Sequence, residues 1–96
     1  MDRLDKKVAL VSGAADGIGL AITKAFVREG AQVAMCDINV AKCDQEANTL
    51  LEQGGKVTSY ACDVGITKDV QNAVTRTLDD FGRIDILVNN AAVGIM

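Results

Sequence analysis

The sequence lacks several residues on which common kinds of protein site depend. It contains no histidine, proline or tryptophan, and only three cysteines and one tyrosine among 96 residues. Because histidine is absent and Cys36, Cys43 and Cys62 form no C-x-x-C pair, we expect no metal site. An odd cysteine count is typical of free thiols in a reducing compartment. The sequence therefore favours a cytoplasmic protein.

Basic residues and long apolar runs are also scarce. Ten Lys and Arg against thirteen Asp and Glu give a formal net charge of −3, so we expect no basic surface for nucleic acid. No apolar run approaches the roughly 20 residues of a bilayer-spanning helix. Asp2 and Asp5 lie where a signal peptide would be positively charged. Neither nucleic acid nor a membrane is an expected partner.

The composition is otherwise that of a small globular unit. Hydrophobic residues make up 49% of the chain and charged residues 24%, which is ordinary for a folded domain. A chain of this length forms one small domain or part of a larger one, with a modest core. No linker interrupts it, so we expect residues 1–96 to contain no second domain.

Two hydrophobic periodicities alternate along the chain. Apolar, β-branched runs predict buried strands at residues 7–11, 31–36, 56–62 and 83–90. Between them, helical spacing predicts three helices, which begin at Gly17, near Val40 and after Thr67, a candidate N-cap. The expected apolar positions of the first helix are Ile18, Ala21, Ile22, Ala25 and Phe26. Those of the second are Val40, Cys43, Ala47, Leu50 and Leu51, and those of the third are Val70, Ala73, Val74, Leu78 and Phe81.

The order of these elements predicts the fold class. The alternation β-α-β-α-β-α-β implies right-handed crossovers and an α/β, Rossmann-like, doubly wound parallel sheet covered on both faces. The sequence stops soon after the fourth predicted strand, at AAVGIM. We therefore expect half of a larger sheet, with four strands, and an exposed apolar edge at the fourth.

A glycine-rich turn follows the first predicted strand, in VALVSGAADGIGLAI at residues 8–22. In such a sheet this turn directs the N-terminus of a helix at a cleft, where N–H groups and the helix dipole bind phosphate without a cationic side chain. Gly13 would permit the turn, Gly17 the approach of a phosphate and Gly19 close packing of the helix. The alternative is that these glycines serve only the turn and its packing.

Polar residues follow the other predicted strands. Asp37 lies 20 residues after Gly17 at the end of the second strand, where an acid accepts hydrogen bonds from both ribose hydroxyls of an adenosine. A carboxylate there repels a 2′-phosphate, which favours NAD over NADP. Asp63 ends the third strand, at the adenine side of the cleft or as a cap of its loop. Asn89 and Asn90 end the fourth and are candidates to tie loop amides together.

Together these residues resemble the N-terminal portion of a short-chain dehydrogenase/reductase of the classical type. That family has G-x-x-x-G-x-G after its first strand, matched here by the three glycines of the turn. Its N-N-A-G after the fourth strand is matched by residues 89–92, with Ala92 in place of glycine. The likeness covers essentially the whole chain, including CDV at 62–64 and FGRIDILVNNA at 81–91.

The resemblance implies an NAD(H)-dependent oxidoreductase acting on an alcohol/carbonyl pair, and a homo-oligomer only for a full-length form. Asp16, where NADP-using members often carry a basic residue, also favours NAD. The residues that the resemblance places at the dinucleotide are Gly13, Ala15, Asp16, Gly17, Ile18, Gly19, Asp37, Asp63, Val64, Asn90 and Ala91.

The resemblance also implies a catalytic Ser and a Tyr-x-x-x-Lys, and neither is present. The only tyrosine, Tyr60, lies in a predicted strand with Val64 four residues on, so we expect no catalytic residue in this chain and no activity from it alone. One alternative is a stand-alone, non-catalytic module that binds NAD or adenine nucleotides. Another is an interaction fragment that uses the fourth strand's edge. A methyltransferase is disfavoured because its turn usually reads G-x-G-x-G.

Overall fold

The computed structural model describes residues 3–90, which alternate between strands and helices in the predicted order. Its elements are β1 (Val8–Ser12), α1 (Gly17–Arg28), β2 (Gln32–Asp37), α2 (Val40–Glu52), β3 (Lys56–Ala61), α3 (Thr67–Phe81) and β4 (Ile86–Asn89). Both boundaries of each strand lie within three residues of the predicted ones. None of the described helices is long and apolar enough to cross a membrane.

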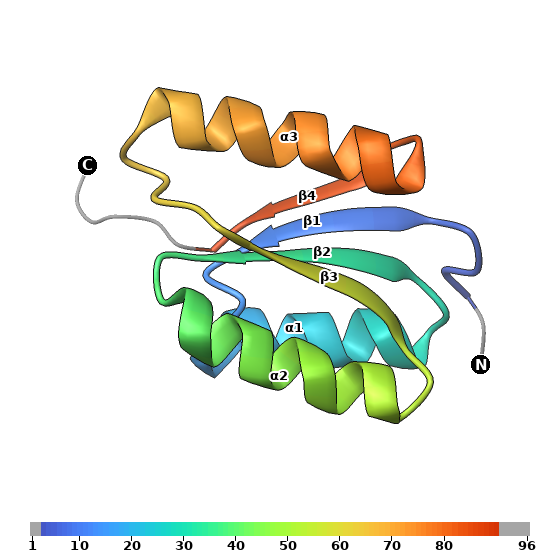
Figure 1. The fold of residues 1–96 in the computed structure, drawn as a ribbon. Helices are drawn as coiled ribbons and strands as arrows, with labels where there is room; N and C mark the ends of the chain where they lie inside the picture. The colour runs from blue at the N-terminus through green and yellow to red at the C-terminus, as the bar shows by residue number, and fades with distance from the viewer. Residues whose placement is uncertain (1–2, 91–96) are drawn as a thin grey trace.

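The four strands form one parallel sheet in the order β3-β2-β1-β4. Helices α1 and α2 lie on one face and α3 on the other (Figure 1). The predicted Rossmann-like α/β fold is confirmed. The chain proceeds from β1 to β3 in one direction and then returns to place β4 on the other side of β1. Ser12 at the end of β1 consequently lies between Cys36 of β2 and Asn89 of β4, at the point where strand order reverses.

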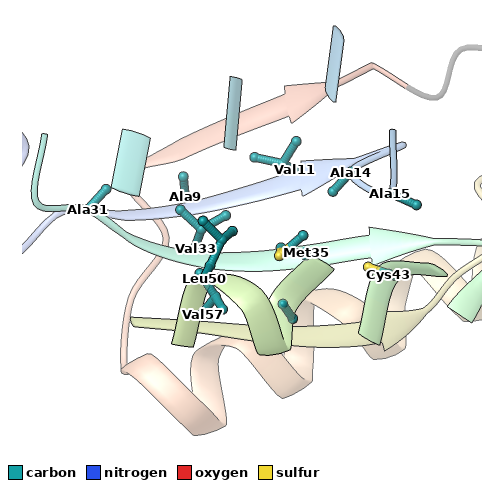
Figure 2. Packing of buried hydrophobic residues seen from close by; sticks show 11 residues of the cluster. Ala9, Val11, Ala14, Ala15, Ala31, Val33, Met35, Cys43, Leu50 and Val57 are labelled. Carbon is teal, nitrogen blue, oxygen red and sulfur yellow. The ribbon is translucent and has the colours of Figure 1, made fainter. Parts of the chain in front are cut away.

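Strand β1 is buried along its whole length because both of its faces are covered. On the face of α1 and α2, its side chains Ala9 and Val11 join a cluster with Val33 and Met35 of β2 (Figure 2). On the face of α3, Leu10 joins a second cluster. Burial on both faces explains why β1 shows no alternation of polar and apolar residues.

The start and the buried face of α3 differ from the prediction. Ile66, not Thr67, occupies the N-cap position, and Thr67 is the first helical residue. Val70 and Leu78, which were expected to be buried, are 38% and 45% exposed. Thr77 is fully buried instead, because its hydroxyl donates a hydrogen bond to the Ala73 carbonyl at 2.7 Å and so needs no water.

The two other helices also expose some of the apolar residues that were expected to be buried. In α1, Ile18 and Ala21 are exposed, whereas Thr23 is fully buried and donates to the Gly19 carbonyl at 2.9 Å. In α2, the terminal positions Val40 and Leu51 are 39% and 48% exposed. The remaining predicted positions of α2 (Cys43, Ala47 and Leu50) are buried as expected.

Strand β4 is shorter than the predicted segment 83–90. Before it, Asp85 and Val8 exchange two hydrogen bonds, from Val8 N to Asp85 Oδ2 at 2.9 Å and from Asp85 N to the Val8 carbonyl at 2.8 Å. Residues 83–85 therefore form a bridge to the start of β1 and do not extend the strand. Leu87 of β4 is 67% exposed, which agrees with the apolar edge expected there.

Candidate functional site

The glycine turn, defined here as residues 13–19, connects β1 to α1 at the C-terminal edge of the sheet. Gly13 has a φ of 64° and Gly17 a φ of 57°, a left-handed conformation that residues with a Cβ rarely adopt. A Cβ on Gly17 would meet nothing within 4 Å. Gly17 is therefore required by its backbone conformation, and the space in front of it is open.

Gly19 is required for the opposite reason, which is crowding. A Cβ on Gly19 would lie 1.9 Å from the Gly13 carbonyl oxygen and 2.7 Å from Asn90 Nδ2. Asn90 Nδ2 itself donates to the Gly13 carbonyl at 3.4 Å. The absence of a side chain at Gly19 lets the start of α1 approach both the turn and the end of β4, as the sequence predicted.

Two backbone amides of the turn are used within the protein. Ala14 N donates to the Cys36 carbonyl at 3.0 Å, and Ala15 N donates to Asp37 Oδ2 at 2.9 Å. Both methyl groups are buried in the α1–α2 cluster. Leu20 N donates to the Asp16 carbonyl at 3.2 Å, so the N–H groups just before Leu20 lie at the open end of α1. Those groups, with the helix dipole, are the donors that the turn offers to an anion.

Asp16 and Ile18 are exposed members of the turn. Asp16 occupies the N-cap position in an extended conformation, and its side chain makes no capping hydrogen bond. Ile18 is 71% exposed, and Ile38, next to Asp37, is exposed to the same extent. Both are apolar surfaces at the C-terminal edge of the sheet. Ile38 was not among the predicted site residues.

Ser12 lies at the same edge of the sheet and was not among the predicted site residues. Its hydroxyl points at the Val88 carbonyl and at Asn89 Oδ1, both at 3.3 Å, and it accepts a hydrogen bond from Asn90 N at 3.0 Å. Ser12 thus fastens the end of β4 to the end of β1. The available signal was a polar residue at the end of an otherwise apolar strand.

Asp63 and Val64 lie at the same edge, after β3. Asp63 Oδ1 accepts a hydrogen bond from Gly65 N at 2.9 Å, so Asp63 does cap its loop, one of the two predicted roles. Its own amide donates to Asp69 Oδ2, in the first turn of α3, at 3.0 Å. Val64 is half-buried against the α3-side cluster. Of the predicted residues, only Ala91 lies outside the part of the chain that the structure describes.

The cysteines and the tyrosine show no reactive environment. Burial raises the pKa of the Cys36 thiol and that of the Cys43 thiol to about 12, so both keep their protons at neutral pH. Burial is the main cause that raises the pKa of Tyr60, and its hydrogen bond to Asp80 is the second. Within residues 3–90, no three His, Cys, Asp or Glu side chains lie close enough together to hold a metal ion.

Comparison with known proteins identifies the family of this arrangement. The family model for short chain dehydrogenases matches residues 7–96, nearly the whole chain. The chain belongs to the short-chain dehydrogenase family. Proteins of this family are oxidoreductases that use a nicotinamide dinucleotide.

Individual short-chain dehydrogenases are similar in sequence and in structure. D-threitol dehydrogenase of Mycolicibacterium smegmatis is 47% identical over 91 residues, which are 95% of this chain and 35% of that protein. Sorbitol dehydrogenase of Cereibacter sphaeroides is 46% identical over 95% of this chain and 34% of its own length. The crystal structure of a hydroxysteroid dehydrogenase from Escherichia coli superposes with a TM-score of 0.91 at 33% identity, over 97% of this chain and 40% of that one.

The chain spans about a third of the length of the curated short-chain dehydrogenases it matches. That third contains the glycine turn, the strand-end acids Asp37 and Asp63, and the Ser12–Asn90 link. All of them lie at the C-terminal edge of the sheet, where doubly wound sheets bind their ligands. The glycine turn and the Ser12–Asn90 link lie at the reversal of strand order between β1 and β4, and Asp37 and Asp63 follow β2 and β3 on one side of it.

Proposed function

We propose that residues 1–96 are the N-terminal, NAD(H)-binding part of a single Rossmann domain, and that the whole protein is an NAD-dependent oxidoreductase of an alcohol/carbonyl pair. The observation that carries the choice of NAD is Asp37, a half-buried carboxylate at the end of β2 that reaches Ala15 N at 2.9 Å. A negative charge so close to the glycine turn accepts hydrogen bonds from ribose hydroxyls and repels a 2′-phosphate. Neither Ile38 nor Asn39 supplies a compensating cation.

We propose a role for each predicted residue, and for Ala91, which lies outside the described residues, the role rests on the resemblance alone. We propose that the pyrophosphate lies at the first turn of α1, where Gly13, Gly17 and Gly19 leave the backbone accessible and Asp16 and Ile18 flank it. Asp63 and Val64 would border the adenine, and Asn90 and Ala91 would contact the cofactor near its ribose. Ala15 contributes indirectly, because its N–H is bonded to Asp37.

The bound nicotinamide would supply hydride transfer, and this chain would supply binding and orientation. Tyr60, the only tyrosine, donates its hydroxyl to Asp80 and packs under the Arg76 guanidinium, 4.2 Å from the ring centroid. It is not placed as a proton donor, so we expect no turnover from these 96 residues alone. The names of similar proteins agree with alcohol substrates and NAD, among them the rat 15-hydroxyprostaglandin dehydrogenase [NAD(+)], which is 44% identical.

A cytoplasmic location is part of the proposal. Its support is the state of the cysteines, since all three are buried and free, as expected in a reducing compartment.

Calorimetric titration of the 96-residue chain with NAD and with NADP tests the proposed function. We expect NAD to bind more tightly, and Asp37→Ala to weaken NAD binding and narrow the difference from NADP. Gly17→Val is the control for the turn, because it should abolish binding while leaving the helical circular dichroism signal. Equal affinities for the two dinucleotides, or a preference that Asp37→Ala leaves unchanged, would contradict the assignment.

A further inference from the structure

Each oxygen of the Asp37 carboxylate accepts a hydrogen bond from a backbone amide. Oδ2 accepts from Ala15 N and Oδ1 from Asn39 N, each at 2.9 Å. Ala15 precedes Asp37 by 22 residues and belongs to the glycine turn, whereas Asn39 begins the connection to α2. The carboxylate therefore joins two loops at the C-terminal edge of the sheet.

We propose that Asp37 is a positioning residue that fixes the shape of the glycine turn, in addition to its role toward ribose. This inference rests on the proposed function and extends it. Ala15 is only 2% exposed, so its N–H has little access to water and would remain unsatisfied without the carboxylate. Each carboxylate oxygen has a second lone pair, so Asp37 can hold the two amides and still accept hydrogen bonds from ribose hydroxyls.

The turn has a second anchor that does not depend on the side chain of residue 37. Ala14 N donates to the carbonyl of Cys36 at 3.0 Å, and Cys62 N donates to the carbonyl of Asp37 at 3.1 Å. These bonds use only backbone atoms. Substitution of Asp37 should therefore loosen the turn at Ala15 while Ala14 and the end of β2 stay in place.

One consequence concerns the choice between NAD and NADP. Removing the carboxylate relieves the repulsion of a 2′-phosphate, but it also removes the acceptor of the Ala15 amide. The start of α1, whose N–H groups are the donors to pyrophosphate, follows directly after that amide. A substitution of Asp37 that is meant to exchange the cofactor preference should therefore strengthen NADP binding less than the lost repulsion alone would, unless the new residue restores an acceptor for the Ala15 amide.

Hydrogen exchange on the unliganded 96-residue chain, read by NMR, tests the positioning role without a cofactor. In Asp37→Ala we expect the Ala15 amide to exchange about tenfold faster, because it has lost one hydrogen bond. The exchange rate of the Ala14 amide should be unchanged. Asp37→Asn keeps one oxygen and should retain protection at only one of Ala15 and Asn39. The matched control, Asp63→Ala at the end of β3, should leave Ala15 protected. Unchanged exchange at Ala15, or equal acceleration at Ala14 and Ala15, would overturn the proposal.

A second titration separates the turn from the ribose. The probe is 2′,3′-dideoxy-ADP, which carries a diphosphate but no ribose hydroxyl for Asp37. Asp37→Ala and Asp37→Asn have equal charge, but the Asn oxygen can replace one of the two lost acceptors. If the exchange experiment shows that Ala15 stays protected in Asp37→Asn, the alanine variant should bind the probe about three- to tenfold more weakly. Equal affinities of the two variants despite a protected Ala15 would refute the positioning role. Failure of the wild-type chain to bind NAD would refute the proposed function and leave the exchange result to decide this inference.

Discussion

Gly17 and Gly19 lie two residues apart, and a side chain is unfavourable at each for a different physical reason. Gly17 has a left-handed backbone in open space, whereas a Cβ on Gly19 would overlap the Gly13 carbonyl oxygen at 1.9 Å. The first problem is strain confined to one residue. The second can be relieved only if α1 moves away from the turn and from Asn90.

The two glycines should therefore respond differently to the same substitution. We expect Gly17→Ala to lower the free energy of unfolding by about 1–2 kcal/mol, the cost of a left-handed alanine. Gly19→Ala should cost about 3 kcal/mol, the upper end of the usual cost of overpacking, because backbone must shift. Urea unfolding of both variants measures the difference, and each serves as the control for the other. Equal losses would show that the close approach at Gly19 does not constrain the turn.

At the level of residues, the sequence predicted which positions gather at the site but not how they are joined. The glycine spacing and the strand-end acid were sufficient to place Gly13, Gly19 and Asp37 at one edge. The bond from Asp37 to Ala15 and the contacts of Ser12 with β4 depend on side-chain rotamers and on the pairing of β1 with β4. Those details are set by tertiary packing, which a linear pattern does not contain.

At the level of elements, the sequence predicted every strand and helix but assigned some buried positions wrongly. Helices α1 and α3 bury Thr23 and Thr77, whose hydroxyl groups bond to a carbonyl four residues earlier in the same helix. A count of apolar residues overlooks such threonines. It also includes residues at helix ends, such as Ile18 and Leu78, which extend beyond the sheet surface and are exposed.

The bridge between β4 and β1 adds an electrostatic element to the sheet. The pKa of Asp85 is lowered from its ordinary value of 3.8. The main cause is the hydrogen bond and 2.6 Å ion pair with Arg83, and the hydrogen bond from Val8 N adds to it. The folded state thus favours the ionised carboxylate. This contribution to stability is complete above the unfolded-state pKa and is lost as pH falls through the lower folded-state pKa.

Asp85→Asn should therefore show a stability deficit that depends on pH. We expect the variant to be less stable than wild type at neutral pH, because it loses the ion pair, and the deficit to shrink below about pH 4. Urea unfolding between pH 3 and pH 7 measures this. Asp79→Asn removes the same charge from an exposed position of α3 and controls for net charge. A stability deficit that stays constant down to pH 3 would show that the contribution of Asp85 to stability does not depend on its negative charge.

At the level of the whole molecule, the three cysteines are distributed over both faces of the sheet, so their accessibility can be measured on each face. Cys43 of α2 lies in one core cluster, and Cys36 and Cys62 lie in the other. All three are buried, and burial is the main cause that raises the pKa of each thiol. A thiol reagent should therefore react with them slowly until the structure opens.

Thiol labelling should therefore measure how dinucleotide binding stabilises the entire fold. If the chain unfolds as one cooperative unit, the three thiols should react at a common rate at pH 8, and urea should raise that rate. Because the proposed NAD site is built from β1, β2 and β4 together, NAD at a hundred times its Kd should slow all three about a hundredfold. NADP at the same concentration should slow them less, which controls for unspecific effects of nucleotide. Protection of Cys36 and Cys62 without Cys43 would instead mean that α2 opens independently and that the two faces of the sheet are not energetically coupled.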